Sequence, residues 1–171
     1  SFLISINPQM KATQYLKDKI FSLDELQKQV TRWKLKNKTI AFTNGVFDLL
    51  HKGHLSSLHE AASHADVLIV AVNSDSSVKK LKGPTRPIND EETRALLLAE
   101  LMVTDAVIVF EEDTPLQLIK TLMPDVLIKG GDYTIDQIAG AKEVIENGGK
   151  VILAQIVDGI STTKTIEKMK N

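Results

Sequence analysis

The chain has 171 residues and carries 21 Lys and Arg against 22 Asp and Glu, which gives a formal net charge of -1. This balance argues against bulk attraction to nucleic acid or to a membrane surface, so any anion must be bound by a local arrangement of residues. Cysteine is absent from the sequence, which excludes disulfides, thiolate metal sites and a cysteine nucleophile.

The length fits a single domain with a substantial core. The longest apolar run, VLIVAV at 67–72, is too short to span a bilayer, and the first residues lack the basic segment and apolar core of a secretory signal. We therefore expect a cytoplasmic protein that binds neither membrane nor nucleic acid. Nothing about the fold is inferred from residues 1–10.

An amphipathic helix is predicted at about 22–36. Ser22 and Glu25 have the spacing of a capping box. The apolar residues that follow recur at helical spacing, at Leu23, Leu26, Val30 and Trp33. Residues 1–37 are accordingly assigned to an N-terminal extension that includes this helix, and residues 38–171 to the main domain. The apolar side of the helix is expected to pack on that domain or on a partner chain.

Five short runs of aliphatic and β-branched residues follow, and each is apolar on both faces, as parallel strands covered by helices are. The runs occupy 39–43, 67–72, 106–110, 125–129 and 150–155. Helix-like segments lie near 54–64, 90–101, 114–122, 138–147 and 161–170. This alternation predicts an α/β fold with a doubly wound, Rossmann-like, five-stranded parallel sheet. The polar segment 73–90, which contains Gly and Pro, is predicted to be a long functional or mobile loop.

The stretch FTNGVFDLLHKGHLSSLHEA, residues 42–61, leaves the first predicted strand and enters a helix. In an open α/β sheet, ligands bind beyond the carboxyl ends of the strands. Gly45 and Gly53 would let the backbone approach a phosphate near a helix start, where free N–H groups favour anions. His51 and His54 are three residues apart and share one helix face, so both imidazoles can reach one bound group. Two imidazole donors suit a phosphate that gains charge in a transition state.

Other interpretations of the histidines are weaker for this pair. A structural or surface role is the usual one for a lone histidine, and we assign it to His59 and His64. Metal ligation by His51 and His54 lacks a third ligand of matching spacing, so no metal site on the protein is predicted.

The segment GVFDLLHKGH resembles the GxFDxxHxGH signature of the cytidylyltransferase-like nucleotidyltransferases, relatives of the HIGH-motif adenylyl-transferring enzymes. Later blocks resemble the adenylyltransferase domain of bacterial heptose biosynthesis: LIVAVNSDSSVKKLKGPTRPIN, FEEDTPLQLIKTLMPDVLIKGGDY, IAGAKEVIENGGKV and DGISTTKTI. The resemblance covers about residues 38–170 and implies the HIGH-motif nucleotidyltransferase fold for 38–171. The implied reaction joins the AMP moiety of ATP to D-glycero-β-D-manno-heptose 1-phosphate, giving ADP-heptose and pyrophosphate for lipopolysaccharide core synthesis.

The resemblance also implies roles for individual residues. Catalysis is expected from His51, His54 and Lys79, with His54 as the main stabiliser of the transition state. Nucleotide binding is expected from Thr43, Asn44, Gly45, Phe47, Gly53, Gly130, Asp132, Ser161, Thr162 and Thr163. Binding of the sugar phosphate is expected from Asp75, Lys82 and Arg94. ATP is expected to arrive as its Mg²⁺ complex, and the protein is expected to form a homodimer.

Several of these residues also have a purely structural interpretation. The hydroxyl residues at 161–163 suit a helix cap, Asp132 suits a plain turn, and Arg94 could pair with Glu91.

Four acidic residues, Asp48 in the motif and the run at 111–113, are given no catalytic role. Asp48 is assigned to structuring the loop, because a carboxylate repels a neighbouring phosphate unless a cation intervenes. The carboxylates at 111–113 resemble a helix-capping run.

One difference from other members of the superfamily concerns charge. Many of them carry an Arg shortly after a hydroxyl cluster like that at 161–163, where this chain has Ile166. Charge neutralisation is therefore expected from other cations, and the candidates are Lys79, Lys82 and Arg94.

Two other functions remain open at this stage. The histidine motif does not fix the base, so a cytidylyltransferase acting on glycerol 3-phosphate or a related alcohol phosphate is one alternative. The other is a non-catalytic nucleotide-binding module, against which the intact His51, Gly53 and His54 argue.

Overall fold

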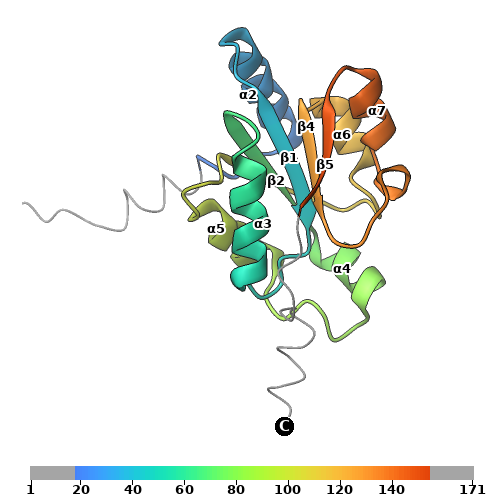
Figure 1. Ribbon diagram of the computed structural model, residues 1–171. Coiled ribbons are helices and arrows are strands. Elements are labelled where there is room, and N and C mark those ends of the chain that lie inside the picture. The colour runs from blue at the N-terminus through green and yellow to red at the C-terminus, as the bar shows by residue number, and fades with distance from the viewer. Residues whose placement is uncertain (1–17, 155–171) are drawn as a thin grey trace, which may run out of the picture.

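Five strands form one sheet in the order β3-β2-β1-β4-β5 in the computed structural model, which describes residues 18–154 (Figure 1). The strands are β1 (Ile40–Gly45), β2 (Val67–Asn73), β3 (Ala106–Phe110), β4 (Val126–Gly130) and β5 (Lys150–Ala154). The helices are α2 (Leu23–Leu35), α3 (Lys52–Ala62), α4 (Asp75–Lys82), α5 (Glu91–Ala99), α6 (Leu116–Leu122) and α7 (Ala141–Glu146), with a 3₁₀ turn, η1 (Ile135–Gln137). Every strand pairing in this sheet is parallel, so the predicted doubly wound α/β fold is confirmed.

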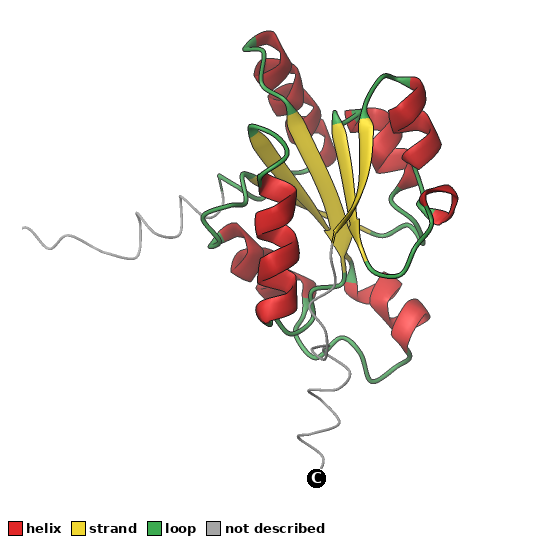
Figure 2. Cartoon of the chain, in the orientation of Figure 1, coloured by secondary structure: helices red, strands yellow, loops and turns green. Residues whose placement is uncertain are grey.

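Alternate residues of the strands build two cores, one on each face of the sheet. Phe42 of β1 and Ile69 of β2 lie in the core covered by α2, α6 and α7. Ala41 and Leu68 lie in the other core, which α3 and α5 cover. Figure 2 shows the sheet between these two helical layers. Because both faces are covered, β2 is buried along its whole length, which explains its continuous apolar sequence.

Three aspartates fix the amino ends of the strands, at the edge of the sheet opposite the candidate site. Each directly precedes a strand, and its carboxylate accepts a hydrogen bond from the backbone N–H of a residue in or just before the adjacent strand. The bonds run from Thr39 to Asp66 at 2.9 Å, from Leu68 to Asp105 at 2.8 Å and from Ile40 to Asp125 at 2.7 Å. The same device therefore holds the register of β2, β3 and β4 against their neighbours.

The helix α2 packs on the sheet. Its predicted capping box is confirmed, because Ser22 and Glu25 exchange hydrogen bonds at the helix start. Leu26 and Val30 are buried in the core, and Trp33 packs against it. The division of the chain at residue 37 stays a prediction, although α2 shares its core with the sheet.

The prediction of a continuous loop over 73–90 is wrong, because α4 occupies Asp75–Lys82. Ser74 caps this helix by accepting a hydrogen bond from the backbone N–H of Ser77. Only Ser77 and Val78 of α4 are buried, so an eight-residue helix shows no readable apolar period. In Figure 1, α4 lies beyond the carboxyl ends of the strands.

The other predicted elements lie close to those observed. The helix expected at 161–170 lies outside the described residues. Among residues 18–154, no helix combines the length and the apolar character that a membrane span needs.

Candidate active site

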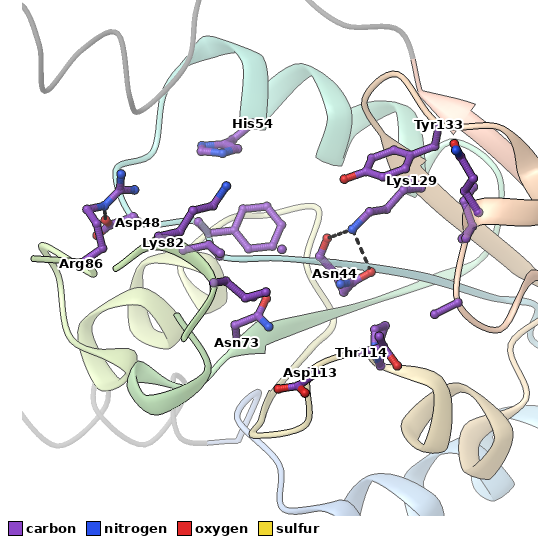
Figure 3. Close-up of a pocket in the computed structure, with 18 of the residues that line it drawn as sticks. Asn44, Asp48, His54, Asn73, Lys82, Arg86, Asp113, Thr114, Lys129 and Tyr133 are labelled. Atoms are coloured by element: carbon purple, nitrogen blue, oxygen red, sulfur yellow. Dashed lines mark hydrogen bonds and ion pairs between the residues drawn. The ribbon is translucent and has the colours of Figure 1, made fainter. Parts of the chain in front are cut away.

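Two cavities lie side by side at the carboxyl ends of the strands. The larger, of about 600 Å³, reaches from the loop after β1 to α4 and η1. The smaller, of about 290 Å³, lies between the same loop, α3 and the end of β4. The described residues that line both cavities are Asn44, Gly45, Val46, Phe47, His51, His54, Lys129 and Tyr133. Figure 3 shows side chains from several elements surrounding this space.

Phe47 shapes the loop that leaves β1. Its backbone has a positive φ of 50°, which is unusual for a residue with a side chain. Its buried ring lies 3.0 Å from the position that a Cβ on Gly45 would take, so a larger residue at 45 would displace the ring. The ring also meets His54 edge-on, with centroids 5.3 Å apart. Phe47 therefore supports a predicted catalytic side chain as well as lining the site.

His51 and His54 lie together at the start of α3. His51 is the N-cap, and its Nδ1 accepts a hydrogen bond from the backbone N–H of His54 at 3.4 Å. The two rings are stacked, with centroids 3.8 Å apart and planes 17° from parallel. Because Nδ1 of His51 is an acceptor, the proton of its neutral ring is on Nε2, which is then a donor. The predicted convergence of the two imidazoles is therefore present in the fold.

Burial favours the neutral form of both histidines. Burial lowers the pKa of His51 below its ordinary value. Burial also lowers the pKa of His54 to about 4; the nearby His51 adds to this effect and the Leu49 carbonyl opposes it. In its neutral form, each ring can still donate a hydrogen bond to a phosphate through one ring nitrogen.

Lys129 enters the site from the end of β4. Its Nζ lies 3.3 Å from the side-chain oxygen and 3.5 Å from the backbone oxygen of Asn44 (Figure 3). The same nitrogen lies 5.6 Å from the centroid of the Tyr133 ring. Burial lowers the pKa of Lys129 below its ordinary value. Both hydrogen-bond acceptors of Lys129 are uncharged oxygens of Asn44.

The turn after β4 brings Tyr133 over the strand end. Gly131 has a φ of 126°, and a Cβ there would lie 2.6 Å from the Tyr133 ring. A glycine at 131 is therefore needed both for the backbone conformation and for the position of the aromatic ring.

Asp48 organises the loop that follows α4. Its buried carboxylate accepts hydrogen bonds from Arg86 Nε at 2.6 Å and from the backbone N–H groups of Ile88 and Asn89 at 2.8 and 3.0 Å. The predicted loop-structuring role of Asp48 is confirmed. This ion pair holds Arg86 in the wall of the larger cavity.

Arg94 is fully buried among hydrogen-bond acceptors. Its guanidinium donates to the Asp75 carboxylate at 2.7 Å and to the backbone oxygens of Val46, Asn73 and Asn89 at 2.8, 2.7 and 3.0 Å. It thereby ties the loop after β1 to the end of β2 and to the start of α5. The suggested pairing of Arg94 with Glu91 is wrong, since Glu91 accepts from the backbone N–H of Asp75.

A family model described as cytidylyltransferase-like matches residues 42–168, which is most of the chain. The chain belongs to the cytidylyltransferase-like family. The resemblance indicated by the histidine motif is thus confirmed.

Curated relatives of this cytidylyltransferase-like chain carry the name bifunctional protein HldE. The relative from Mesorhizobium japonicum is 52% identical over 154 residues, which are 90% of this chain and 31% of the relative. The relative from Paramagnetospirillum magneticum is 53% identical over 151 residues, which are 88% of this chain and 31% of that protein. The chain therefore spans about 31% of the length of these relatives.

Solved structures share the fold. The lipopolysaccharide core biosynthesis protein from Thermoplasma volcanium is 29% identical, with a TM-score of 0.57, over 70% of this chain and 97% of that one. A pantoate-beta-alanine ligase from Francisella tularensis, solved with beta-gamma ATP and beta-alanine, has a TM-score of 0.58 over 88% of this chain and 76% of that one. At 16% identity, the ligase shows a common fold alone.

The predicted site residues of this cytidylyltransferase-like chain fall into three groups. Those that line one or both cavities are Thr43, Asn44, Gly45, Phe47, His51, Gly53, His54, Lys82 and Gly130. Those that lie outside the described walls of both cavities are Asp75, Lys79, Arg94 and Asp132. Ser161, Thr162 and Thr163 lie outside the described residues.

Several residues that line the larger cavity have no site role predicted from the sequence, namely Asn73, Arg86, Asp113, Thr114, Lys129 and Tyr133. Lys129 and Tyr133 belong to the block KGGDY, where only Gly130 and Asp132 were assigned. Lys129 stands at the carboxyl end of a predicted strand. The rule that ligands bind beyond these ends, which drew attention to the histidine motif, could therefore also have selected Lys129.

Proposed function

We propose that this chain is an adenylyltransferase that joins the AMP moiety of ATP to D-glycero-β-D-manno-heptose 1-phosphate and gives ADP-heptose and pyrophosphate. The observation that carries the proposal is the 52% identity to a bifunctional protein HldE over 90% of the chain. The resemblance of the later sequence blocks to the heptose branch supplies the sugar. The lipopolysaccharide core biosynthesis protein that is 29% identical supports a product used in lipopolysaccharide synthesis.

The chemistry needs no side-chain nucleophile. An oxygen of the sugar phosphate forms a bond to the α-phosphorus of ATP, and the bond from that phosphorus to the bridging β-phosphate oxygen breaks. The electron pair leaves with pyrophosphate. A sugar phosphate carries its own negative charge near neutral pH, so the protein must mainly align the two phosphates and neutralise their charge.

The two cavities suit the two substrates of this reaction. We assign the nucleotide phosphates to the smaller cavity, where Gly53 and the start of α3 offer backbone N–H groups. We assign the sugar phosphate to the larger cavity, where Lys82 and Arg86 supply positive charge. His51 and His54 line both cavities and so lie where the two substrates would meet.

The magnesium ion belongs to the nucleotide substrate in this proposal. ATP is used as its Mg²⁺ complex, and its phosphate oxygens are the ligands that Mg²⁺ prefers.

The remaining residue assignments stay proposals. Ser161, Thr162 and Thr163 would bind the terminal phosphates of ATP, and Asp132 would bind the ribose. Lys79 would contribute charge from the exposed side of α4. Asp75 and Arg94 would act by positioning, because each already bonds to the other.

Pyrophosphate release tests the proposal. ATP, CTP and GTP, each with Mg²⁺, should be crossed with heptose 1-phosphate and with glycerol 3-phosphate. We expect pyrophosphate release only from the combination of ATP with heptose 1-phosphate. Binding of ATP without turnover on either acceptor would instead favour the non-catalytic nucleotide-binding module.

A second candidate activity is transfer of CMP to glycerol 3-phosphate or a related alcohol phosphate. The description of the matched family as cytidylyltransferase-like favours it. Release of pyrophosphate from CTP with glycerol 3-phosphate in the same assay would establish this activity in place of the first.

We further propose that the protein acts in the cytoplasm as a homodimer. ATP and a sugar phosphate are cytoplasmic metabolites, and the interface is left unassigned. A sedimentation measurement that gives the mass of one chain would contradict the dimer.

A further inference from the structure

We propose that Lys129 is a catalytic residue that neutralises the charge on the α-phosphate of the nucleotidyl group while that group passes from pyrophosphate to the sugar phosphate. This inference rests on the proposed transfer reaction, whichever base and acceptor are used. It assigns the main cationic role to β4 instead of to the lysines that follow β2.

Lys129 lies in the wall that the two cavities share. The transferring group must lie where the nucleotide site and the acceptor site meet. Eight described residues line both cavities. Among these shared residues of the described chain, Lys129 is the sole Lys, Arg, Asp or Glu. Burial favours the neutral form of the shared histidines, because it lowers the pKa of each.

Lys129 also lacks a counter-charge among the described residues. Lys129 Nζ has long contacts with two oxygens of Asn44, at 3.3 and 3.5 Å, and no carboxylate of residues 18–154 lies within ion-pair distance. Burying a cation without an anion is costly, and this cost is why the pKa of Lys129 is lowered. A phosphate at the boundary of the cavities would supply the anion.

The other cations are less suitable for this task. Arg86 is paired with Asp48 at 2.6 Å, and Arg94 with Asp75 at 2.7 Å. Lys82 is exposed, and it lines the larger cavity but not the smaller one.

In the proposed step, Lys129 moves no proton. One phosphorus–oxygen bond forms to the sugar phosphate and one breaks to pyrophosphate, while the ammonium group exchanges its weak bonds to Asn44 for the oxygens of the transferring group. Removing a single group that stabilises a developing charge costs on the order of a hundredfold in turnover.

The test compares Lys129→Met, Lys129→Arg and Lys150→Met with the wild type. Lys150 is a matched control, because it is an exposed lysine at the amino end of the adjacent strand β5. For Lys129→Met we expect kcat to fall about a hundredfold while the Kd for ATP changes less than about threefold. Lys129→Arg should keep an intermediate kcat, and Lys150→Met should match the wild type.

A melting temperature separates catalysis from structure. Lys129→Met removes a partly buried cation that has no carboxylate partner among residues 18–154, so its melting temperature should be no lower than that of the wild type. If this variant fails to fold, Lys129→Gln takes its place with the same expectations, because the amide can still bond to Asn44.

Three results would overturn the proposal: an unchanged kcat in Lys129→Met, a weaker ATP affinity with an intact kcat, or an equal loss in Lys150→Met. Failure of the proposed function has a different signature. A wild type that uses CTP and glycerol 3-phosphate removes the heptose assignment, and Lys129 is then tested on that pair. A wild type with no turnover at all overturns both.

Discussion

At the scale of single residues, burial lowers the pKa of both His51 and His54 and so favours their neutral rings. His54 packs between the Phe47 edge and the His51 ring, and this burial lowers its pKa to about 4. A phosphate that gains charge in the transition state would then meet a neutral hydrogen-bond donor already held in place by packing.

The first prediction concerns turnover. His54→Ala should fold normally and lose turnover on the order of a hundredfold, because it removes a donor aimed at the transferring phosphate. Circular dichroism checks the fold and pyrophosphate release checks the rate. Near-normal turnover in a folded variant would remove His54 from the mechanism.

The second prediction concerns the stability of the free protein. The folded pKa of His54, about 4, lies below the ordinary value of 6.5, so folding favours the neutral ring. The contribution of His54 to the free energy of unfolding is therefore fully present above pH 6.5. It is lost as the pH falls towards the folded pKa of about 4, and the loss is on the order of 2 kcal/mol.

Urea unfolding of the wild type and of His54→Gln at several pH values measures this loss. His54→Gln should lose less stability than the wild type over that range, while the exposed control His64→Gln should follow the wild type. Parallel pH profiles for the wild type and His54→Gln would contradict the prediction.

At the scale of elements, the aspartates before β2, β3 and β4 link each strand to its neighbour at the edge away from the site. Asp125 accepts from the backbone N–H of Ile40, and Asp105 accepts from that of Leu68. These bonds leave the carboxyl edge free for ligands while they hold the amino edge in register.

The third prediction follows from these bonds. Asp125→Ala should lower the free energy of unfolding by roughly 1 to 3 kcal/mol, because a partly buried backbone N–H loses its acceptor. The exposed control Glu112→Ala should change it by less than about 0.5 kcal/mol. Equal stability of the two variants in urea unfolding would show that the Asp125 bond contributes nothing.

At the scale of the whole molecule, the sequence was most informative where the pattern was continuous. Strands buried on both faces have apolar runs, and the histidine motif stands at the edge where such folds bind ligands. The helix α4 could not be predicted because it buries only two residues. The burial of Arg94 depends on carbonyls from three separate segments, which no local pattern records. Lys129 was within reach of the sequence, since it stands at the carboxyl end of a predicted strand, but its contact with Asn44 of another strand was not.

The central claim is that the sugar phosphate itself attacks the α-phosphate of ATP where the two cavities meet. The most direct measurement uses heptose 1-phosphate with isotopically labelled phosphate oxygens and follows the products by phosphorus NMR. The account predicts ADP-heptose with the label on the phosphate next to the sugar and in the bridge between the two phosphates, together with unlabelled pyrophosphate. Label in the pyrophosphate, or failure to form a sugar nucleotide, would contradict it.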